Sequence, residues 1–289
     1  MVPLHVSDRE WPIRQEDVPD ADVIIASWWE TAEWMWHLPR RKGAKVHFIQ
    51  GYDDPPDFVA DRVEKVWRLP LFKIAVSQWL VDLGRERFEI EHIALVPNSI
   101  DHHLFKPKLR PKGNPPTIGF LFHEAALKDI SVTIAAIQQL RRTIPATKVV
   151  SFGTSKPAPG QLPPGTEFHH LPAQEKIAQI YGRCDAWLST SQREGFNLPP
   201  LEAMACGCPA ICGKTGRPLE IIENGVNGYL VDQGDVGGFT DALSKILALP
   251  DQAWREMSQA AMSAVAHPTW EESSALFEQA LERAVAGLT

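Results

Sequence analysis

Residues 188–212 read LSTSQREGFNLPPLEAMACGCPAIC, and this order of residue types predicts a strand, a loop, a helix and a second strand. The apolar end of the first strand gives way to small polar residues. Pro199 and Pro200 pre-set φ for the first helical turn, and Gly207 supplies a left-handed residue at the helix end. The apolar run 209–212 follows. The loop and the helix start therefore lie at the carboxyl end of a sheet strand, where open α/β sheets bind ligands.

Two carboxylates flank the start of this helix. Glu194 lies in the loop, and Glu202 lies within the first turn of the helix. Unpaired backbone N–H groups at a helix start favour an anion such as phosphate. An ionised carboxylate accepts hydrogen bonds from two hydroxyls at once. The segment therefore predicts a site for a ligand that carries both phosphate and hydroxyl groups.

The segment 194–209, EGFNLPPLEAMACGCP, resembles the donor-site signature of retaining glycosyltransferases with the two-domain GT-B fold, family 4 in particular. The resemblance continues at 215–231, TGRPLEIIENGVNGYLV, and at 96–107, VPNSIDHHLFKP, which is similar to the interdomain crossing of the family. It covers roughly residues 20–285. The resemblance implies an α/β protein of two Rossmann-like domains, each with a parallel sheet, and transfer of a sugar from a nucleotide-sugar donor.

The resemblance also implies roles for the residues of this segment. Glu202 would accept hydrogen bonds from the ribose hydroxyls of the donor, and Glu194 would accept them from hydroxyls of the transferred sugar as a catalytic residue. The backbone after Glu194 would contact the sugar and the phosphates. This donor-binding stretch comprises Gly195, Phe196, Asn197 and Leu198.

Two further positions follow the strand TIGFLF, residues 117–122. The family carries an arginine and a lysine there, about five residues apart, which stabilise the diphosphate as the bond breaks. Lys128 matches the lysine, so the resemblance implies catalytic and donor-binding roles for it, against the alternative of a solvated surface lysine. His123 stands at the arginine position among the donor-binding residues. This is a departure, because a neutral imidazole holds a diphosphate less well.

A third catalytic position lies in the first half of the chain. Many family members carry a histidine after a strand of the first domain, and the matching strand here is KVHFIQ, residues 45–50. No histidine follows it, so Asp53 or Gln50 would take that role. An ordinary turn is the alternative for Asp53, because glycine and aspartate are common turn residues. This stretch is most similar to the rhamnosyltransferase-like branch.

Two glutamates are also typical of glycosidases, which place an acid and a nucleophile on opposite sides of the bond. The resemblance instead places Glu202 at the ribose, away from the reacting carbon. In this fold retention is attributed to same-face attack, with the leaving phosphate taking the proton of the acceptor. We therefore expect no metal and no cofactor, and the sequence shows no Asp-x-Asp metal motif near the site.

Composition narrows the class of protein. The chain of 289 residues has a net charge of −7, which argues against nucleic-acid binding. It has no apolar stretch long enough for a transmembrane helix and no signal-peptide pattern, which favours a cytoplasmic protein. The spacing of the four cysteines fits neither a zinc site nor a redox pair, so they are expected to be buried; they are Cys184, Cys206, Cys208 and Cys212.

Strand and helix patterns alternate throughout, which predicts parallel sheets. A proline-rich basic stretch at 106–116 separates two halves. We expect an acceptor-side N-terminal domain at 1–105, joined by a C-terminal helix at 270–289, and a nucleotide-sugar-binding domain at 106–269. The first domain holds only four predicted strands and is short for the family. We expect a partner to cover it, with a second copy, another subunit and a membrane surface left open.

Three functions remain open at this point. The first is a retaining glycosyltransferase acting on a carbohydrate, lipid-linked or small-molecule acceptor. The second is a catalytically weak nucleotide-sugar-binding subunit that needs a partner chain for acceptor binding, which the short first domain and His123 favour. The third is a GT-B epimerase or phosphorylase.

Overall fold

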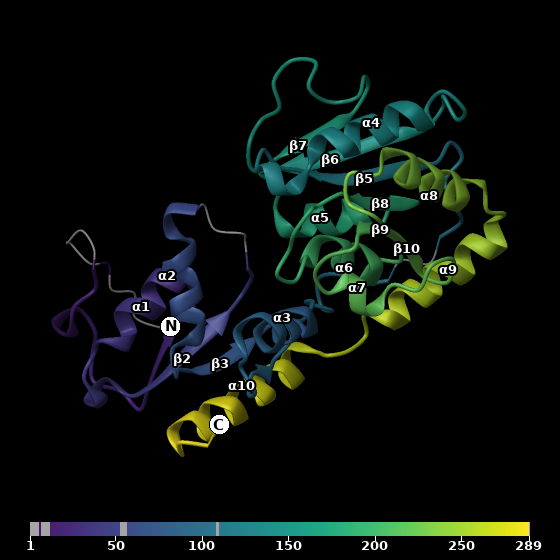
Figure 1. Cartoon of the computed structure of the whole chain (residues 1–289). Helices are drawn as coiled ribbons and strands as arrows, with labels where there is room; N and C mark the ends of the chain where they lie inside the picture. Colours follow the sequence, from purple (N-terminus) through teal and green to yellow (C-terminus); the bar gives the residue numbers. More distant parts are fainter. Residues whose placement is uncertain (1–5, 7–11, 53–56, 108–109, 289) are drawn as a thin grey trace. The chain divides into compact units, whose positions relative to one another are not determined.

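The computed structural model describes residue 6 and residues 12–52, 57–107 and 110–288, and it divides into two compact units (Figure 1). Unit 1 comprises Met1–Asn98 and Glu271–Thr289, and unit 2 comprises Ser99–Trp270. The division falls after Asn98, whereas the sequence places the boundary after residue 105. The catalytic candidate Asp53 lies outside the described residues.

Unit 1 is built on a parallel sheet with the strand order β1-β2-β3-β4. The strands are β1 (Val23–Ala26), β2 (Ala44–Ile49), β3 (Phe72–Ala75) and β4 (Ala94–Leu95). Its helices are α1 (Trp29–Trp36), α2 (Asp57–Arg68), α3 (Gln78–Phe88) and α10 (Trp270–Val285), with short 3-10 turns η1 (Gln15–Asp17) and η2 (Arg40–Lys42). Strands β1, β2 and β3 are each followed by a helix, as the alternating sequence pattern predicts.

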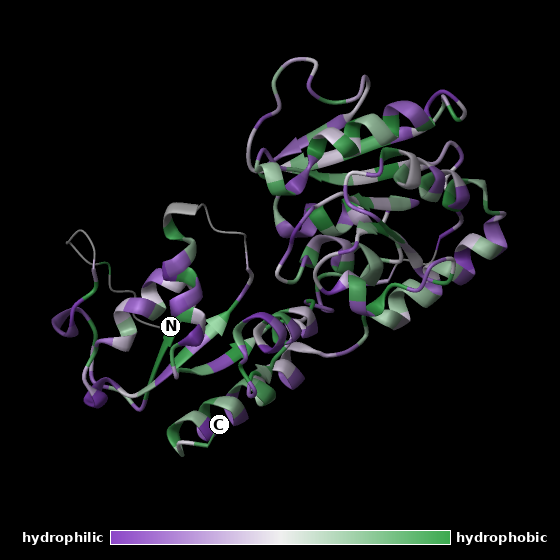
Figure 2. Ribbon diagram, viewed as in Figure 1, coloured by the Kyte–Doolittle hydropathy of each residue, from purple (hydrophilic) through white to green (hydrophobic). Residues whose placement is uncertain are grey.

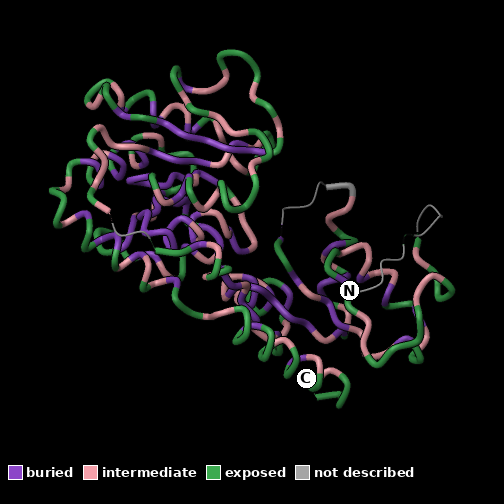
Figure 3. The backbone as a smooth tube through the Cα atoms, turned by 180° about the vertical axis from the view of Figure 1, so that it is seen from behind, coloured by how far each residue is buried: buried purple, intermediate pink, exposed green. Residues whose placement is uncertain are grey.

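Hydrophobic side chains of α10 cover one face of the unit 1 sheet. Phe277 packs on Phe48 of β2 with ring centroids 5.1 Å apart, and Ala280 is buried in the same cluster as Val46 and Ile74. On α1 and α2, Met35 and Val66 form a second cluster with Ala26, Ala32 and Leu71. The two central strands, β2 and β3, are accordingly the most buried, while the outer side of α10 is exposed (Figure 3).

Unit 2 contains a six-stranded parallel sheet with the order β10-β9-β8-β5-β6-β7. The strands are β5 (Thr117–Phe122), β6 (Lys148–Gly153), β7 (Glu167–His170), β8 (Ala186–Ser189), β9 (Ala210–Gly213) and β10 (Gly228–Val231). The chain builds outward from β5 to β6 and β7, and then returns to place β8 on the other side of β5. The order therefore reverses between β5 and β8, which makes this the topological switch point of the sheet.

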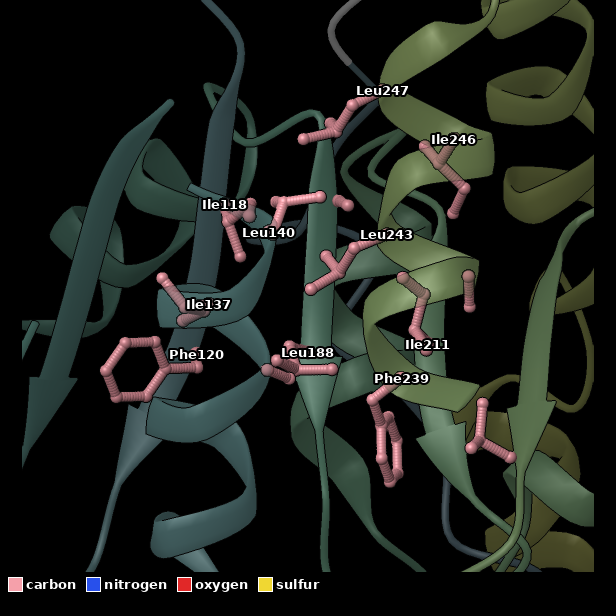
Figure 4. Packing of buried hydrophobic residues seen from close by; sticks show 14 of the residues in the cluster. Ile118, Phe120, Ile137, Leu140, Leu188, Ile211, Phe239, Leu243, Ile246 and Leu247 are labelled. Atoms are coloured by element: carbon pink, nitrogen blue, oxygen red, sulfur yellow. The ribbon is translucent and has the colours of Figure 1, made fainter. Parts of the chain in front are cut away.

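In the described part of unit 2, five helical segments lie between these strands and two more follow β10. They are η3 (Ala126–Lys128), α4 (Ile130–Leu140), α5 (Gln174–Tyr181), α6 (Leu198–Ala205), α7 (Pro218–Ile221), α8 (Val236–Ala248) and α9 (Asp251–Ala264). Strand residues such as Ile118, Leu188 and Ile211 face Ile137 of α4 and Leu243 of α8 in one buried cluster (Figure 4). Hydrophobic residues follow the strands and the inner sides of the helices (Figure 2), as expected for a sheet covered on both faces.

A buried aspartate fixes the segment that leads into β5. Asp185 has no exposed surface, and its carboxylate accepts hydrogen bonds from Arg110 (2.7 Å), Gly113 N (2.8 Å) and Thr117 N (2.7 Å). The Trp254 indole donates to the backbone oxygen of the same residue at 2.9 Å. Much of the segment predicted as a linker is thus held against the sheet by direct hydrogen bonds.

The four cysteines are buried with free thiols, as their spacing predicts. Burial raises the pKa of each thiol, to about 12 for Cys206. Within the described ranges, no helix combines the length and the hydrophobicity needed to cross a bilayer.

Candidate functional site

The loop after β8 is held in a fixed path by the segment that follows β9. Glu194 N donates to Thr215 Oγ1 at 2.9 Å, and Arg217 N donates to Phe196 O at 2.8 Å. Gly216 permits this approach: its φ is +66°, and a Cβ there would lie 2.8 Å from Phe196 O. Residues at the start of the segment 215–231 thus support the loop after β8. The sequence did not assign this role to individual residues.

Asn197 starts helix α6 in a left-handed conformation, with φ 71° and ψ 66°. Asparagine tolerates this region better than most residues. Its Nδ2 donates to Ser189 Oγ at 3.2 Å, which ties the helix start to the end of β8. Leu198 is the first residue of α6, with Pro199 and Pro200 behind it, and Gly207 follows the helix with φ +82°. The helix predicted from the two prolines and the glycine is confirmed.

The structure brings Lys128 and Glu194 together across the switch point. Lys128 Nζ lies 2.5 Å from Glu194 Oε1, with side chains 28% and 13% exposed. Lys128 follows β5 and Glu194 follows β8, so the strand order alone places these two loops side by side. Both residues also line a narrow cavity with Thr133, Ser189 and Asn197.

Further hydrogen bonds join the same two loops. Thr190 Oγ1 donates to Asp129 O at 2.9 Å and lies 2.7 Å from Thr133 Oγ1. Gln192 N donates to Leu127 O at 2.8 Å, and its side-chain amide donates to Asp129 at 2.9 Å. The Lys128–Glu194 pair is therefore carried by a preorganised framework, which limits the reorganisation needed when a charged ligand binds.

His123 lies at the end of β5, as predicted, but it offers a different chemistry from an arginine. Its Nδ1 accepts a hydrogen bond from Ala125 N at 3.0 Å. A ring nitrogen that accepts carries no proton, so in this arrangement Nε2 carries the ring proton. His123 can then give a ligand one N–H donor, in place of the several donors of an arginine.

Glu202 on α6 is half-buried, and its partial burial raises the pKa of its carboxyl. Tyr181, the last residue of α5, donates its hydroxyl to Glu202 Oε2 at 2.9 Å, which opposes that rise. Sequence reasoning missed Tyr181. The available signal was a tyrosine at the end of a predicted helix, since a buried tyrosine hydroxyl usually finds a partner.

A large hollow of about 1070 Å³ lies elsewhere, at the amino ends of β2, β3 and β4 in unit 1. Two of its lysines serve the backbone: Lys45 Nζ donates to Trp36 O and Leu38 O at 2.6 Å, and Lys73 Nζ donates to Leu69 O at 2.6 Å. Burial lowers the pKa of Lys73 to about 8. These cations cap the carbonyls that end α1 and α2, and the hollow lies at the strand edge opposite to the one open α/β sheets use for ligands.

No group of three His, Cys, Asp or Glu side chains is close enough to hold a metal ion in the part of the chain that the structure describes. Lys128, Glu194 and Glu202 contribute charge to the candidate site, and the amide dipoles at the start of α6 add to it.

Residues 101–263 match the family described as glycosyl transferases group 1. The MMP alpha-(1->4)-mannosyltransferase of Mycolicibacterium hassiacum is 26% identical over 279 residues, which cover 92% of this chain and 64% of that protein. Among eight curated relatives, the matched part spans 10% to 64% of the relative's length.

Solved structures show the same fold at low sequence identity. Sucrose-phosphate synthase from Thermosynechococcus elongatus superposes with a TM-score of 0.77 at 22% identity, over 92% of this chain and 74% of that one. Anabaena HepE, solved with UDP-glucose, gives 0.70 at 18% identity, over 92% and 79%. The predicted α/β GT-B fold class is confirmed. The family match spans more than half of the residues of this chain, and the chain therefore belongs to the glycosyl transferases group 1 family.

Proposed function

We propose that this chain is a retaining glycosyltransferase that moves a sugar from a nucleoside-diphosphate sugar to a hydroxyl of a carbohydrate or lipid-linked acceptor. The observation that carries the proposal is the Lys128–Glu194 pair, held at 2.5 Å at the switch point of the unit 2 sheet. The names of the relatives and neighbours, a mannosyltransferase and a protein solved with UDP-glucose among them, support the donor class.

In this proposal the donor diphosphate takes the place of Glu194 as the partner of Lys128. The Lys128 ammonium and the backbone at the start of α6 stabilise the charge that grows on the diphosphate as the bond breaks. Glu194 is then available to accept hydrogen bonds from hydroxyls of the transferred sugar, and Glu202 accepts them from the ribose. This supply of positive charge by the protein is why we propose a reaction without a metal or cofactor.

The proposed chemical step balances without an enzyme nucleophile. The acceptor oxygen forms a bond to the anomeric carbon on the face from which the diphosphate leaves. The bond from that carbon to the phosphate oxygen breaks, and the acceptor proton moves to the departing phosphate oxygen. The configuration at the anomeric carbon is thereby retained.

The second candidate is a nucleotide-sugar-binding subunit with weak turnover of its own. It is favoured by His123, whose accepting Nδ1 leaves the site without the permanent positive charge of the family's arginine. Lys128 would then stabilise a diphosphate leaving group without a second permanent cation at the His123 position.

A panel of UDP, GDP, ADP, dTDP and CMP sugars tests both candidates. Thermal shift reports binding, and free nucleotide release in the same wells reports turnover. A ligand at 100 times its dissociation constant adds roughly 2.7 kcal/mol of stability. The enzyme is supported if one donor raises the melting temperature of the native chain and its nucleotide is slowly released. The Glu194→Gln variant should then still bind this donor but release no nucleotide. A shift without release in the native chain favours the binding subunit, and no shift with any donor contradicts both.

A further inference from the structure

We propose that Tyr181 is a positioning residue that holds Glu202 as an oriented carboxylate for the donor ribose, an inference that rests on the proposed function. The Tyr181 hydroxyl donates to Glu202 Oε2 at 2.9 Å. A phenol has one proton to donate, so this contact commits it to Glu202. With Oε2 turned toward Tyr181, the carboxylate is fixed in one rotamer and its other oxygen is left for a ligand hydroxyl.

Tyr181 is itself held rigidly. Its side chain has no exposed surface, and its ring makes edge contacts with Phe105 and Phe152 at 5.8 Å and with Trp187 at 4.6 Å between centroids. These rings come from three separate parts of unit 2. A tyrosine packed on three sides cannot swing its hydroxyl away, so the direction of its hydrogen bond is set by the core of the unit.

The hydrogen bond has an electrostatic consequence for Glu202. Burial raises the pKa of this carboxyl, and donation by Tyr181 lowers it. Burial and the neighbouring carboxylate hold the pKa of Tyr181 well above its usual range, so it remains a donor throughout the neutral range. Without the hydroxyl, Glu202 would take up a proton at a higher pH, and in its protonated form it would be a poorer acceptor for a ribose hydroxyl.

Among the described residues, the other ionisable groups that act on this pair are two buried thiols. The Cys206 thiol lies near Glu202, and burial raises the pKa of this thiol to about 12. Burial raises the pKa of the Cys184 thiol, near Tyr181, further still. Helix α9, which packs against α6, presents uncharged buried residues, namely Trp254, Met257, Ser258 and Ala261. Acid loss of nucleotide affinity that depends on Tyr181 therefore reports Glu202.

The test is calorimetric binding of UDP, GDP and ADP to the full chain from pH 5 to pH 8. In Tyr181→Phe we expect about tenfold weaker binding at pH 7, the scale of a lost hydrogen bond to a charged group. The midpoint of the acid loss of affinity should also move to higher pH. Tyr229→Phe is the matched control, because Tyr229 lies on β10 and contacts Lys245, and it should bind as the native chain does.

Glu202→Gln separates this inference from the proposed function. If Glu202→Gln binds nucleotides with native affinity at every pH, the ribose role of Glu202 in the proposed function is wrong. If Glu202→Gln binds weakly but Tyr181→Phe matches the native chain in affinity and in pH midpoint, the positioning role of Tyr181 is overturned.

A second measurement applies if Tyr181→Phe does not fold. Carbon-13 labelled glutamate, compared between the native chain and Glu202→Gln, identifies the Glu202 carboxyl signal. An ionised carboxylate at pH 7 supports the proposal, and a protonated carboxyl at pH 7 overturns it.

Discussion

At the scale of single residues, Lys128 is the cation on which the proposed site depends. Its Nζ lies 2.5 Å from Glu194 and its side chain is 28% exposed. We expect Lys128→Met to weaken nucleoside-diphosphate binding by about tenfold or more, because a charged donor to phosphate is lost from a partly desolvated site. Isothermal calorimetry measures the effect. Lys148→Met, an exposed change at the amino end of β6, is the control, and equal losses in both variants would contradict the role of Lys128.

The sequence alone identified Lys128, Glu194 and Glu202 but could not pair them. The contact between Lys128 and Glu194 depends on the order of strands in the sheet, which local patterns do not contain. Tyr181 escaped notice for the same reason, because its partner lies on a different helix. The roles of these residues, and that of Asp53, stay predictions.

At the scale of secondary-structure elements, Asp185 ties β8 to the segment that enters β5. It has no exposed surface, and Arg110 and two backbone N–H groups donate to it. We expect Asp185→Asn to lower the free energy of unfolding by about 3–5 kcal/mol, because it leaves Arg110 partly buried without its counter-charge. Urea unfolding of the full chain measures this. Arg255→Ala, which breaks an exposed ion pair with Asp251 on α9, should lower the free energy of unfolding by less than about 1 kcal/mol. Similar losses in the Asp185→Asn and Arg255→Ala variants would refute the argument.

Gly119 in β5 tests how tightly the strand packs against its neighbours. A Cβ there would lie 2.5 Å from the Trp187 ring and 2.6 Å from Cys184 Sγ. We expect Gly119→Ala to destabilise the chain by about 1–3 kcal/mol or more through overpacking. Gly237→Ala near the start of α8 should instead gain up to about 1 kcal/mol, because its nearest neighbour is 3.4 Å away and alanine favours the helix. Thermal unfolding of both variants measures the sign of each change in stability. A Gly119→Ala variant as stable as the native chain would show that Trp187 can move aside.

Most elements of the sheet were predictable because strands buried on both faces read as short apolar runs. The strand at β7 was predicted at 168–171 and is found at Glu167–His170. The anchoring of 110–117 was not predictable. Its proline-rich basic sequence is typical of a linker, and the carboxylate that holds it lies far along the chain at Asp185.

At the scale of the whole molecule, His47 in β2 gives unit 1 a sensitivity to acid. Its Nδ1 has no hydrogen-bond partner within the described residues, and burial together with the Lys73 charge lowers its pKa to about 3. The unfolded chain therefore binds a proton below pH 6.5 that the folded unit does not. Stability should fall with falling pH between 6.5 and 3, by up to about 1.4 kcal/mol per pH unit.

Native-state hydrogen exchange of the Phe48 and Ile49 amides at pH 7 and pH 5 measures this loss locally. The His47→Leu variant should lose less opening free energy on acidification than the native chain. Equal losses in the two proteins would mean that His47 is not the group responsible.

The strand order of unit 2 also has a consequence for biosynthesis. Apolar residues of β5 such as Ile118 and Phe120 pair on one side with β8, which follows β7 and α5 in the chain. At translation rates of about 5–20 residues per second, that edge of β5 stays unpaired for several seconds during synthesis, until β8 has been made. An unpaired hydrophobic strand edge is a template for aggregation, so the nascent chain should depend on chaperones most strongly between the synthesis of β5 and that of β8.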